Sequence, residues 1–156
     1  MDNFDLRILK KLEMNAKLSL KDIGRNVGLF SPSAISKRIS ILEKEGYIKN
    51  YRAILDYQKL GYNFMTVTFI KAKYAPKYSE EIAKKLVKIK GVISVYFLLG
   101  DIDFVLITIN KTKDDYARIL DELTNIVEIE RTDSRTVLKV FKEYEYDNIL
   151  IEDNYS

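Results

Sequence analysis

Residues 28–46 read GLFSPSAISKRISILEKEG, and this stretch decides the fold of the first half of the chain. Ser31 is a preferred helix cap, and Pro32 fits the first helical position, where its missing N–H costs nothing. The apolar residues at helical spacing are Ile35, Ile39 and Leu42. Gly46 follows Glu45 and is typical of a helix stop. The stretch therefore predicts a helix that begins at Pro32 and ends near Glu45.

Two more helices precede this one. The apolar stripe of residues 4–14 consists of Leu6, Ile8, Leu9 and Leu12, with Asp2 or Asn3 as its cap. Ser19 and Asp22 resemble a capping box for a second, short helix over about 20–27, and Gly28 ends it. Three short helices with a tight turn before the third are typical of a helix-turn-helix.

The outer face of the third helix separates a DNA-binding domain from an ordinary helical bundle. This face consists of Ser33, Ser36, Lys37, Ser40 and Lys44. It holds small hydroxyls and cations without an acid, whereas a merely solvated face usually mixes charges. Small side chains let a helix enter a major groove, and Lys37 and Arg38 can reach guanine edges or phosphate oxygens. The expected DNA-binding residues are Ser31, Ser33, Ala34, Ser36, Lys37, Arg38, Ser40, Lys44, Lys49 and Arg52.

The charge balance agrees with this reading. Residues 1–61 hold 12 Lys or Arg against 7 Asp or Glu, whereas residues 62–156 hold 14 against 16. A basic front half favours a polyanionic partner, here double-stranded DNA. Chance drift of surface charge is the alternative reading, and a solvated role for Lys49 and Arg52 also stays open. Residues 47–61 read as a short hairpin or wing followed by a linker.

The second half reads strand, helix, strand, strand, helix, strand. The four strands are expected within 64–74, 92–99, 104–109 and 136–141. Ser79 is expected to cap the first helix and Thr112 the second, and 100–103 is a tight turn. The class is α+β: an N-terminal, winged-helix-like helix-turn-helix domain and a C-terminal ferredoxin-like βαββαβ sandwich. The expected parts are a domain at 1–47, a wing and linker at 48–61, a ferredoxin-like domain at 62–142 and a tail at 143–156.

The second and third strands are apolar on both sides, although helices can cover only one face. We expect a second copy of the chain to cover the other face, giving a homodimer, with tetramers or octamers as larger assemblies.

Composition limits the chemistry. The chain has no Cys, His or Trp, so thiol nucleophiles, imidazole bases and Cys/His zinc sites are excluded. No apolar run approaches the roughly 18 residues of a membrane span, and residues 1–5 lack the features of a signal peptide. We expect a cytoplasmic protein without membrane partner, cofactor, metal site or catalytic residue, and not an enzyme.

The sequence resembles the Lrp/AsnC (feast/famine) family of transcription regulators over roughly residues 2–142. The matching segments are FDLRIL at 4–9, SLKDIG at 19–24, SPSAISKRI at 31–39, LEKEGYI at 42–48, IKGV at 89–92, LGDIDF at 99–104 and ERT at 130–132. In one respect the chain departs from the family: Phe30 looks like an insertion in the turn that aims the third helix, so base contacts do not transfer directly.

The resemblance implies a small-molecule site, such as one for a free amino acid, in the second domain. The candidate effector residues are Leu99, Gly100, Asp101, Asp103, Asp121, Thr132 and Ser134. Backbone groups of the glycine turn can hold a carboxylate, and Asp103 can hold an ammonium group. Two alternatives stay open: Asp101 and Asp103 simply form a turn, or the pair is catalytic.

The chain is therefore predicted to be a sequence-specific, homo-oligomeric DNA-binding transcription regulator modulated by a small molecule. An architectural DNA-binding protein without ligand control is the runner-up. A small enzyme acting on amino acids is a distant third, because it would leave the basic helix face without a use.

Overall fold

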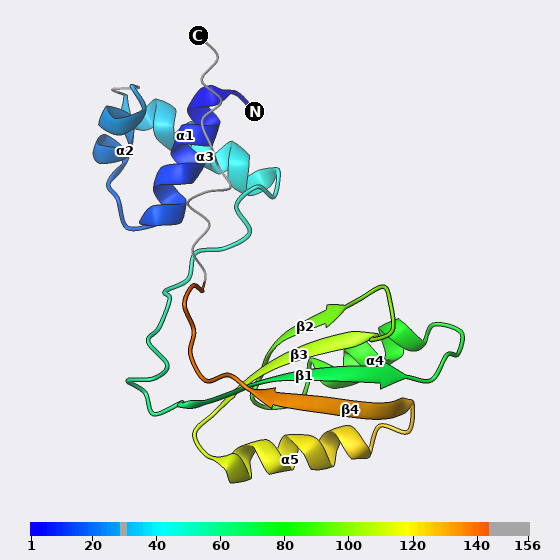
Figure 1. Cartoon of the computed structure of the whole chain (residues 1–156). Helices are drawn as coiled ribbons and strands as arrows, with labels where there is room; N and C mark the ends of the chain where they lie inside the picture. The colour runs from blue at the N-terminus through cyan, green and yellow to red at the C-terminus, as the bar shows by residue number, and fades with distance from the viewer. Residues whose placement is uncertain (29–30, 144–156) are drawn as a thin grey trace. The chain divides into compact units, whose positions relative to one another are not determined.

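The computed structural model describes residues 1–28 and 31–143 and divides the chain into two compact units. The first unit contains Met1–Ile54 with three helices, and the second contains Leu55–Phe141 with a four-stranded sheet and two helices (Figure 1). Phe30 and residues 144–156 of the expected tail lie outside the described residues. Each unit has its own hydrophobic core.

Local capping fixes the first two helices of the first unit. Helix α1, Asn3–Met14, begins after Asp2, whose carboxylate accepts a hydrogen bond from the Asp5 backbone N–H at 3.0 Å. Helix α2, Leu20–Val27, begins after Ser19, whose hydroxyl accepts from the Asp22 N–H at 3.1 Å. Gly28 ends α2 in the left-handed region, with φ +80°. Each such cap stabilises a helix by about 1 kcal/mol.

Helix α3 spans Pro32–Lys44, as the sequence predicts. The Ser31 hydroxyl accepts a hydrogen bond from the Ala34 N–H at 3.4 Å. The core of this unit consists of Ile8, Ile23, Val27, Ile35 and Leu42, none more than 2% exposed. Ile39, the third residue of the predicted stripe, is half-buried and packs against this core.

The hairpin expected within residues 47–61 does not form, because no strand lies between α3 and the first strand of the sheet. Ile48 alone of this segment packs on the helical core, and its N–H donates to the Leu42 carbonyl at 3.2 Å. Tyr47, Tyr51 and Ile54 are exposed. Strand-forming side chains without a neighbouring strand to pair with do not hold an extended ladder.

The second unit is an antiparallel sheet with the strand order β2-β3-β1-β4. Its strands are β1 (Phe64–Ala72), β2 (Val92–Phe97), β3 (Phe104–Asn110) and β4 (Ile129–Thr136). Helices α4 (Tyr78–Leu86) and α5 (Lys113–Thr124) pack on one face, since both contribute to a core built on Ile70 and Phe104. This is the predicted ferredoxin-like βαββαβ arrangement.

Two boundaries in this unit differ from the prediction. The fourth strand is Ile129–Thr136 rather than 136–141. This segment is polar, but its backbone pairs with β1, where Ile70 lies opposite Thr132. An edge strand needs only backbone partners and favours charged side chains, so hydrophobicity does not reveal it. Helix α4 begins one residue before Ser79, and its cap Lys77 has no side-chain cap hydrogen bond.

A glycine and a group of hydroxyl-bearing side chains lie where the sheet packs against the helices. Gly91 has φ +98°, and a Cβ there would lie 2.8 Å from Asn110 Oδ1 and 3.0 Å from Ile119 Cδ1. Tyr116 of α5 donates to Ser134 Oγ at 2.6 Å and lies 2.8 Å from Thr68 Oγ1. These contacts satisfy polar groups that would be costly to bury alone.

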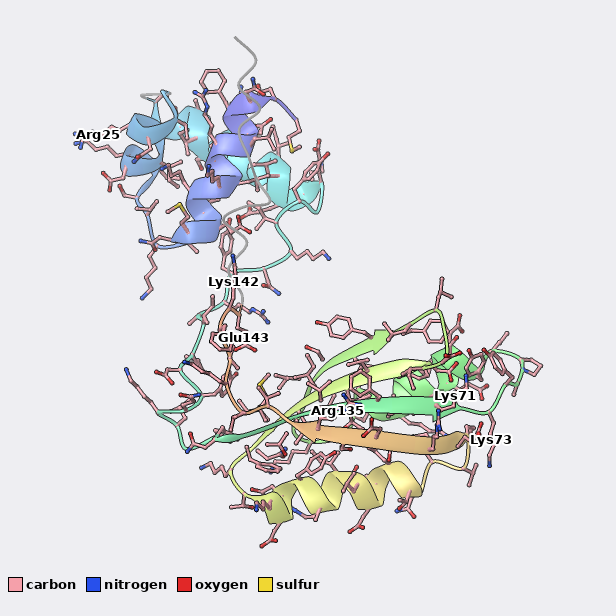
Figure 2. All side chains as sticks on the ribbon, viewed as in Figure 1. Arg25, Lys71, Lys73, Arg135, Lys142 and Glu143 are labelled. Carbon is pink, nitrogen blue, oxygen red and sulfur yellow. The ribbon has the colours of Figure 1, made fainter. Side chains whose placement is uncertain are left out.

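The opposite face of the sheet carries no described helix. The alternate residues of β1 and β3 on this face are Val67, Phe69, Val105, Ile107 and Ile109. Tyr96 of β2 lies opposite Val105, whereas β4 contributes Arg131, Asp133 and Arg135. Lys71 and Arg135 border the apolar strip (Figure 2). Among the described residues, no helix is both long and apolar enough to cross a membrane.

Candidate nucleic-acid interface and effector loop

Helix α3 is held by its inward residues and presents a separate outer face. Ile35 and Leu42 are buried, whereas the five residues of the outer face are exposed. These outer residues are Ser33, Ser36, Lys37, Ser40 and Lys44, as expected from their spacing. Within the described residues, Lys37 makes no hydrogen bond or ion pair. The α3 outer face therefore offers hydroxyls and free ammonium groups to a polyanion.

Two of the expected contact residues begin the helix. Ser31 caps α3 through Ala34 and also lies 2.8 Å from the Ser33 hydroxyl. Ala34 is half-buried at the edge of the outer face. Lys49 and Arg52, beyond the end of α3, are exposed.

Glu43, one of the acids near the end of α3, has a hydrogen-bond partner a few residues away. Its carboxylate accepts a hydrogen bond from the Tyr51 hydroxyl at 2.8 Å. Partial loss of hydration around the hydroxyl, followed by its hydrogen bond to Glu43, raises the pKa of the half-exposed Tyr51 to about 12. Tyr51 therefore keeps its proton at neutral pH and shares the negative charge at this end of the helix.

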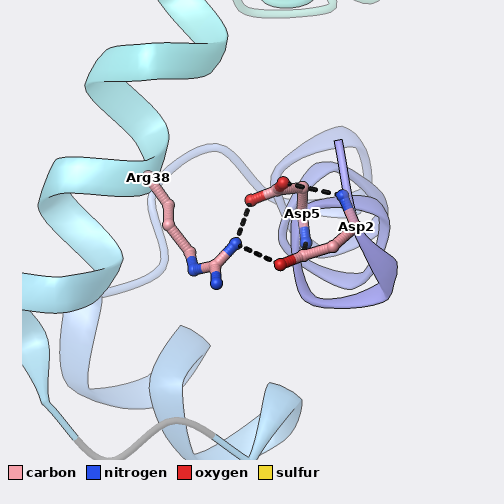
Figure 3. A network of polar contacts seen from close by, with 3 residues as sticks. All are labelled: Asp2, Asp5 and Arg38. Atoms are coloured by element: carbon pink, nitrogen blue, oxygen red, sulfur yellow. Dashed lines mark hydrogen bonds and ion pairs between the residues drawn. The ribbon is translucent and has the colours of Figure 1, made fainter.

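Arg38 lies beside the outer face, and its guanidinium is paired within the protein, so its contact with DNA stays a prediction. Its Nη1 donates to Asp5 Oδ1 at 2.7 Å and to Asp2 Oδ2 at 2.9 Å (Figure 3). At about 100° per residue, Arg38 lies about 140° around the helix from Ser33, beside the buried stripe. The helical spacing alone indicates this position of Arg38 on the helix. It does not indicate the two acids that bind Arg38, because they are 33 and 36 residues away in sequence.

The second candidate site is the loop of residues 98–103 between β2 and β3. The Leu98 N–H donates to the Asp103 carbonyl at 2.8 Å, which closes the loop. Leu99 is 97% exposed, and Gly100 takes φ +136°. Asp101 is exposed. The tip of this loop thus presents backbone groups, an apolar side chain and one carboxylate to solvent.

Asp103 lies under the loop rather than at its surface, with a side chain 2% exposed. Its carboxylate accepts hydrogen bonds from the Ala72 N–H at 2.8 Å and the Tyr78 hydroxyl at 3.1 Å. Lys71 Nζ lies 3.4 Å away. Burial alone would raise the pKa of Asp103, but these partners hold it below its ordinary value. The Asp103 carboxylate therefore fastens the loop to β1 and α4, and both of its oxygens already accept hydrogen bonds.

The other candidate effector residues are only partly brought together. Thr132 lies opposite Ile70, which pairs on its other side with Phe104, so Thr132 is exposed at the same end of the sheet as the loop. Ser134 is occupied by Tyr116 and Thr68. Asp121 is exposed on α5, and no described hydrogen bond or ion pair joins its side chain to the loop.

Sequence reasoning missed Lys71 and Tyr78, the side chains that hold Asp103. One signal was available for Lys71, because it is the single charged residue within Phe64–Ala72. Tyr78 gave no such signal. Burial, followed by its hydrogen bond to Asp103, raises the pKa of Tyr78 to about 12, so the hydroxyl remains a donor at neutral pH.

Comparison with known proteins covers both units. Residues 1–49 match a winged helix-turn-helix DNA-binding domain. Residues 67–146 match the Lrp/AsnC ligand binding domain. The chain belongs to the Lrp/AsnC family. As a member of this family, it is a transcriptional regulator that joins a helix-turn-helix DNA-binding domain to a ligand-binding domain.

Individual Lrp/AsnC relatives span nearly the whole chain. The HTH-type transcriptional regulator FL11 of Pyrococcus furiosus is 37% identical over 143 residues, 92% of this chain and 93% of that protein. The proline dehydrogenase transcriptional activator of Rhizobium radiobacter is 30% identical over 145 residues, 92% of each chain.

Solved structures of transcriptional regulators have the same fold. A transcriptional regulator of Neisseria meningitidis, solved as a complex with L-Met, has a TM-score of 0.86 at 25% identity and covers 97% of this chain and 99% of its own. AsnC of E. coli has a TM-score of 0.83 at 24% identity and covers 94% of this chain and 98% of its own.

Proposed function

We propose that this chain regulates transcription as a sequence-specific DNA-binding homodimer whose activity responds to a small molecule such as a free amino acid. The acid-free outer face of α3 carries the DNA part of this proposal. Its serines suit base edges and phosphates, and its lysines suit phosphates or guanine edges. Lys49 and Arg52 are proposed to contact the DNA backbone nearby.

The open face of the sheet supports the homodimer. Its apolar strip on β1 and β3 is bordered by charged residues on β4, which is the usual anatomy of a protein interface. The occupant we propose is a second copy of this chain, because one sheet face packed on its twin buries both strips by the same contacts.

The exposed end of the sheet supports the ligand part. Leu99, Gly100, Asp101 and Thr132 are proposed to form the effector contacts. The complex of the N. meningitidis regulator with L-Met favours an amino acid as the ligand class. Asp103 and Ser134 would support this site from below through their internal hydrogen bonds.

Selection of binding sites from a random DNA library tests the function. The full chain is expected to enrich one motif and to bind it at least about 10³-fold more tightly than random DNA at physiological salt. Similar affinities for both DNAs would support the architectural alternative. Sedimentation of the chain with each of the twenty amino acids then reports the assembly, dimer or larger, and any ligand that shifts it.

A further inference from the structure

The guanidinium of Arg38 joins the recognition helix to the first turn of α1. Its Nη1 atom bridges Asp2 and Asp5, at 2.9 and 2.7 Å (Figure 3). Its Cζ lies 5.7 Å from the centre of the Phe4 ring. The Arg38 side chain is 31% exposed and that of Asp5 14%. A partly shielded ion pair with two acceptors holds its geometry better than an exposed single pair.

Hydrogen bonds within the first turn of α1 hold both carboxylates independently of Arg38. The Asp2 N–H donates to Asp5 at 2.9 Å, and the Asp5 N–H donates to Asp2 at 3.0 Å. The hydrogen bond from the Asp5 backbone, with a further contribution from Arg38, lowers the pKa of Asp2. Hydrogen bonds to Asp5 and then Asp2 raise the pKa of Arg38. Arg38 therefore binds a rigid pair of carboxylates at the beginning of a helix rather than two mobile side chains.

Lys37 provides the contrast within the same helix. It is adjacent in sequence, is exposed on the outer face, and has no ion pair with another described residue. A cation that binds a DNA phosphate releases counterions, whereas one whose charge is already neutralised inside the protein does not. We therefore expect the loss of Lys37 and the loss of Arg38 to have different effects on the salt dependence of DNA binding.

We infer that Arg38 is a positioning residue, which sets the angle of α3 against α1 and does not itself contact DNA. This inference rests on the proposed contact between the outer face of α3 and DNA. Loss of the bridge would turn the outer face away from its base contacts. Binding to the selected motif would weaken, while the sequence-independent attraction of the remaining lysines would persist.

The test is a salt series on the full chain with the selected motif and with random DNA. Arg38→Ala is expected to weaken binding to the motif about 10-fold, with unchanged affinity for random DNA and an unchanged slope of log K against log[salt]. Lys37→Ala is the matched control and is expected to reduce the magnitude of the slope by about 1.8 per dimer for either DNA, which is about 0.9 for each of its two copies.

A double-mutant cycle identifies the partner of Arg38. In an Asp5→Ala background, Arg38→Ala is expected to cost less motif affinity than in the wild type, because the shorter of the two ion pairs of Arg38 is already lost. Circular dichroism and thermal melting check that every variant is folded. If Arg38→Ala does not fold, Arg38→Gln, which keeps the aliphatic stem, replaces it with the same expectations.

The outcomes separate the inference from the proposed function. A reduced slope for Arg38→Ala, an equal loss in both backgrounds, or no loss for the motif would overturn the positioning role. An unchanged slope and affinity for Lys37→Ala would instead contradict the proposed DNA contact of α3.

Discussion

The backbone N–H of Ala72 donates to the buried carboxylate of Asp103 at 2.8 Å, which ties the loop between β2 and β3 to the end of β1. The same carboxylate accepts from Tyr78 of α4. One side chain thus connects a strand, a helix and the loop that carries the proposed effector contacts. Any ligand that binds the tip of this loop would act on a segment whose base is fixed.

Asp103 makes the stability of the second unit depend on pH. Its folded pKa is lowered, so it stabilises the fold above its unfolded pKa of about 3.9, and this contribution is lost as pH falls through the folded value. We expect Asp103→Asn to lower the free energy of unfolding at pH 7 by about 1.5–3 kcal/mol. Urea unfolding at pH 7 and pH 3 should give a smaller gap between variant and wild type at pH 3. An equal gap at both pH values would contradict a charged Asp103.

Gly91 is expected to tolerate no side chain. Gly91→Ala introduces a Cβ that meets Asn110 and Ile119, in addition to the strain of its positive φ. Gly61→Ala is the matched control, because Gly61 has φ +86° but open space around it. Strain alone costs about 1–2 kcal/mol, and overpacking adds about 1–3 kcal/mol at Gly91. Equal midpoints of urea unfolding for the two variants would show that the close approach to Asn110 does not matter.

A charged side chain at the centre of the open sheet face is expected to disrupt the proposed dimer. Ile107→Lys on β3 is expected to shift the chain from dimer to monomer in sedimentation velocity, because a cation would be buried against the partner. Val87→Lys, at the exposed end of α4, changes the same kind of residue away from this face and should leave the dimer intact. If Ile107→Lys sediments like the wild type, the dimer uses another surface.

Tyr116 is expected to stabilise the contact between α5 and the sheet through its hydroxyl. Tyr116→Phe keeps the ring but removes contacts with Thr68 and Ser134, for an expected loss of about 1 kcal/mol. Tyr47→Phe, at an exposed position, is the control and should change the free energy of unfolding by less than about 0.5 kcal/mol. If both variants change the free energy of unfolding by a similarly small amount, the contact between α5 and the sheet is stabilised by packing alone.

The helices of the first unit could be predicted because their signals are local. Ser19, Ser31 and Gly28 act on backbone groups a few residues away, so the boundaries of α2 and α3 follow from the sequence. The ferredoxin-like pattern was also readable, since Tyr116, Ile119 and Leu123 of α5, for example, lie at helical spacing and are all buried in the core. The fourth strand was not, because Ile129–Thr136 is polar and takes its structure from pairing with β1.

By itself, the sequence determined the two-domain α+β plan, the capped helices and the acid-free outer face of α3, all of which follow from patterns within single helices, strands and turns. The tertiary structure alone decided which charges are available. Arg38 is bound by Asp2 and Asp5, and Asp103 by Ala72, Tyr78 and Lys71, so both charged groups have partners that lie far away in the sequence. Side chains far apart in sequence meet only after folding, and burial then favours paired charges over free ones.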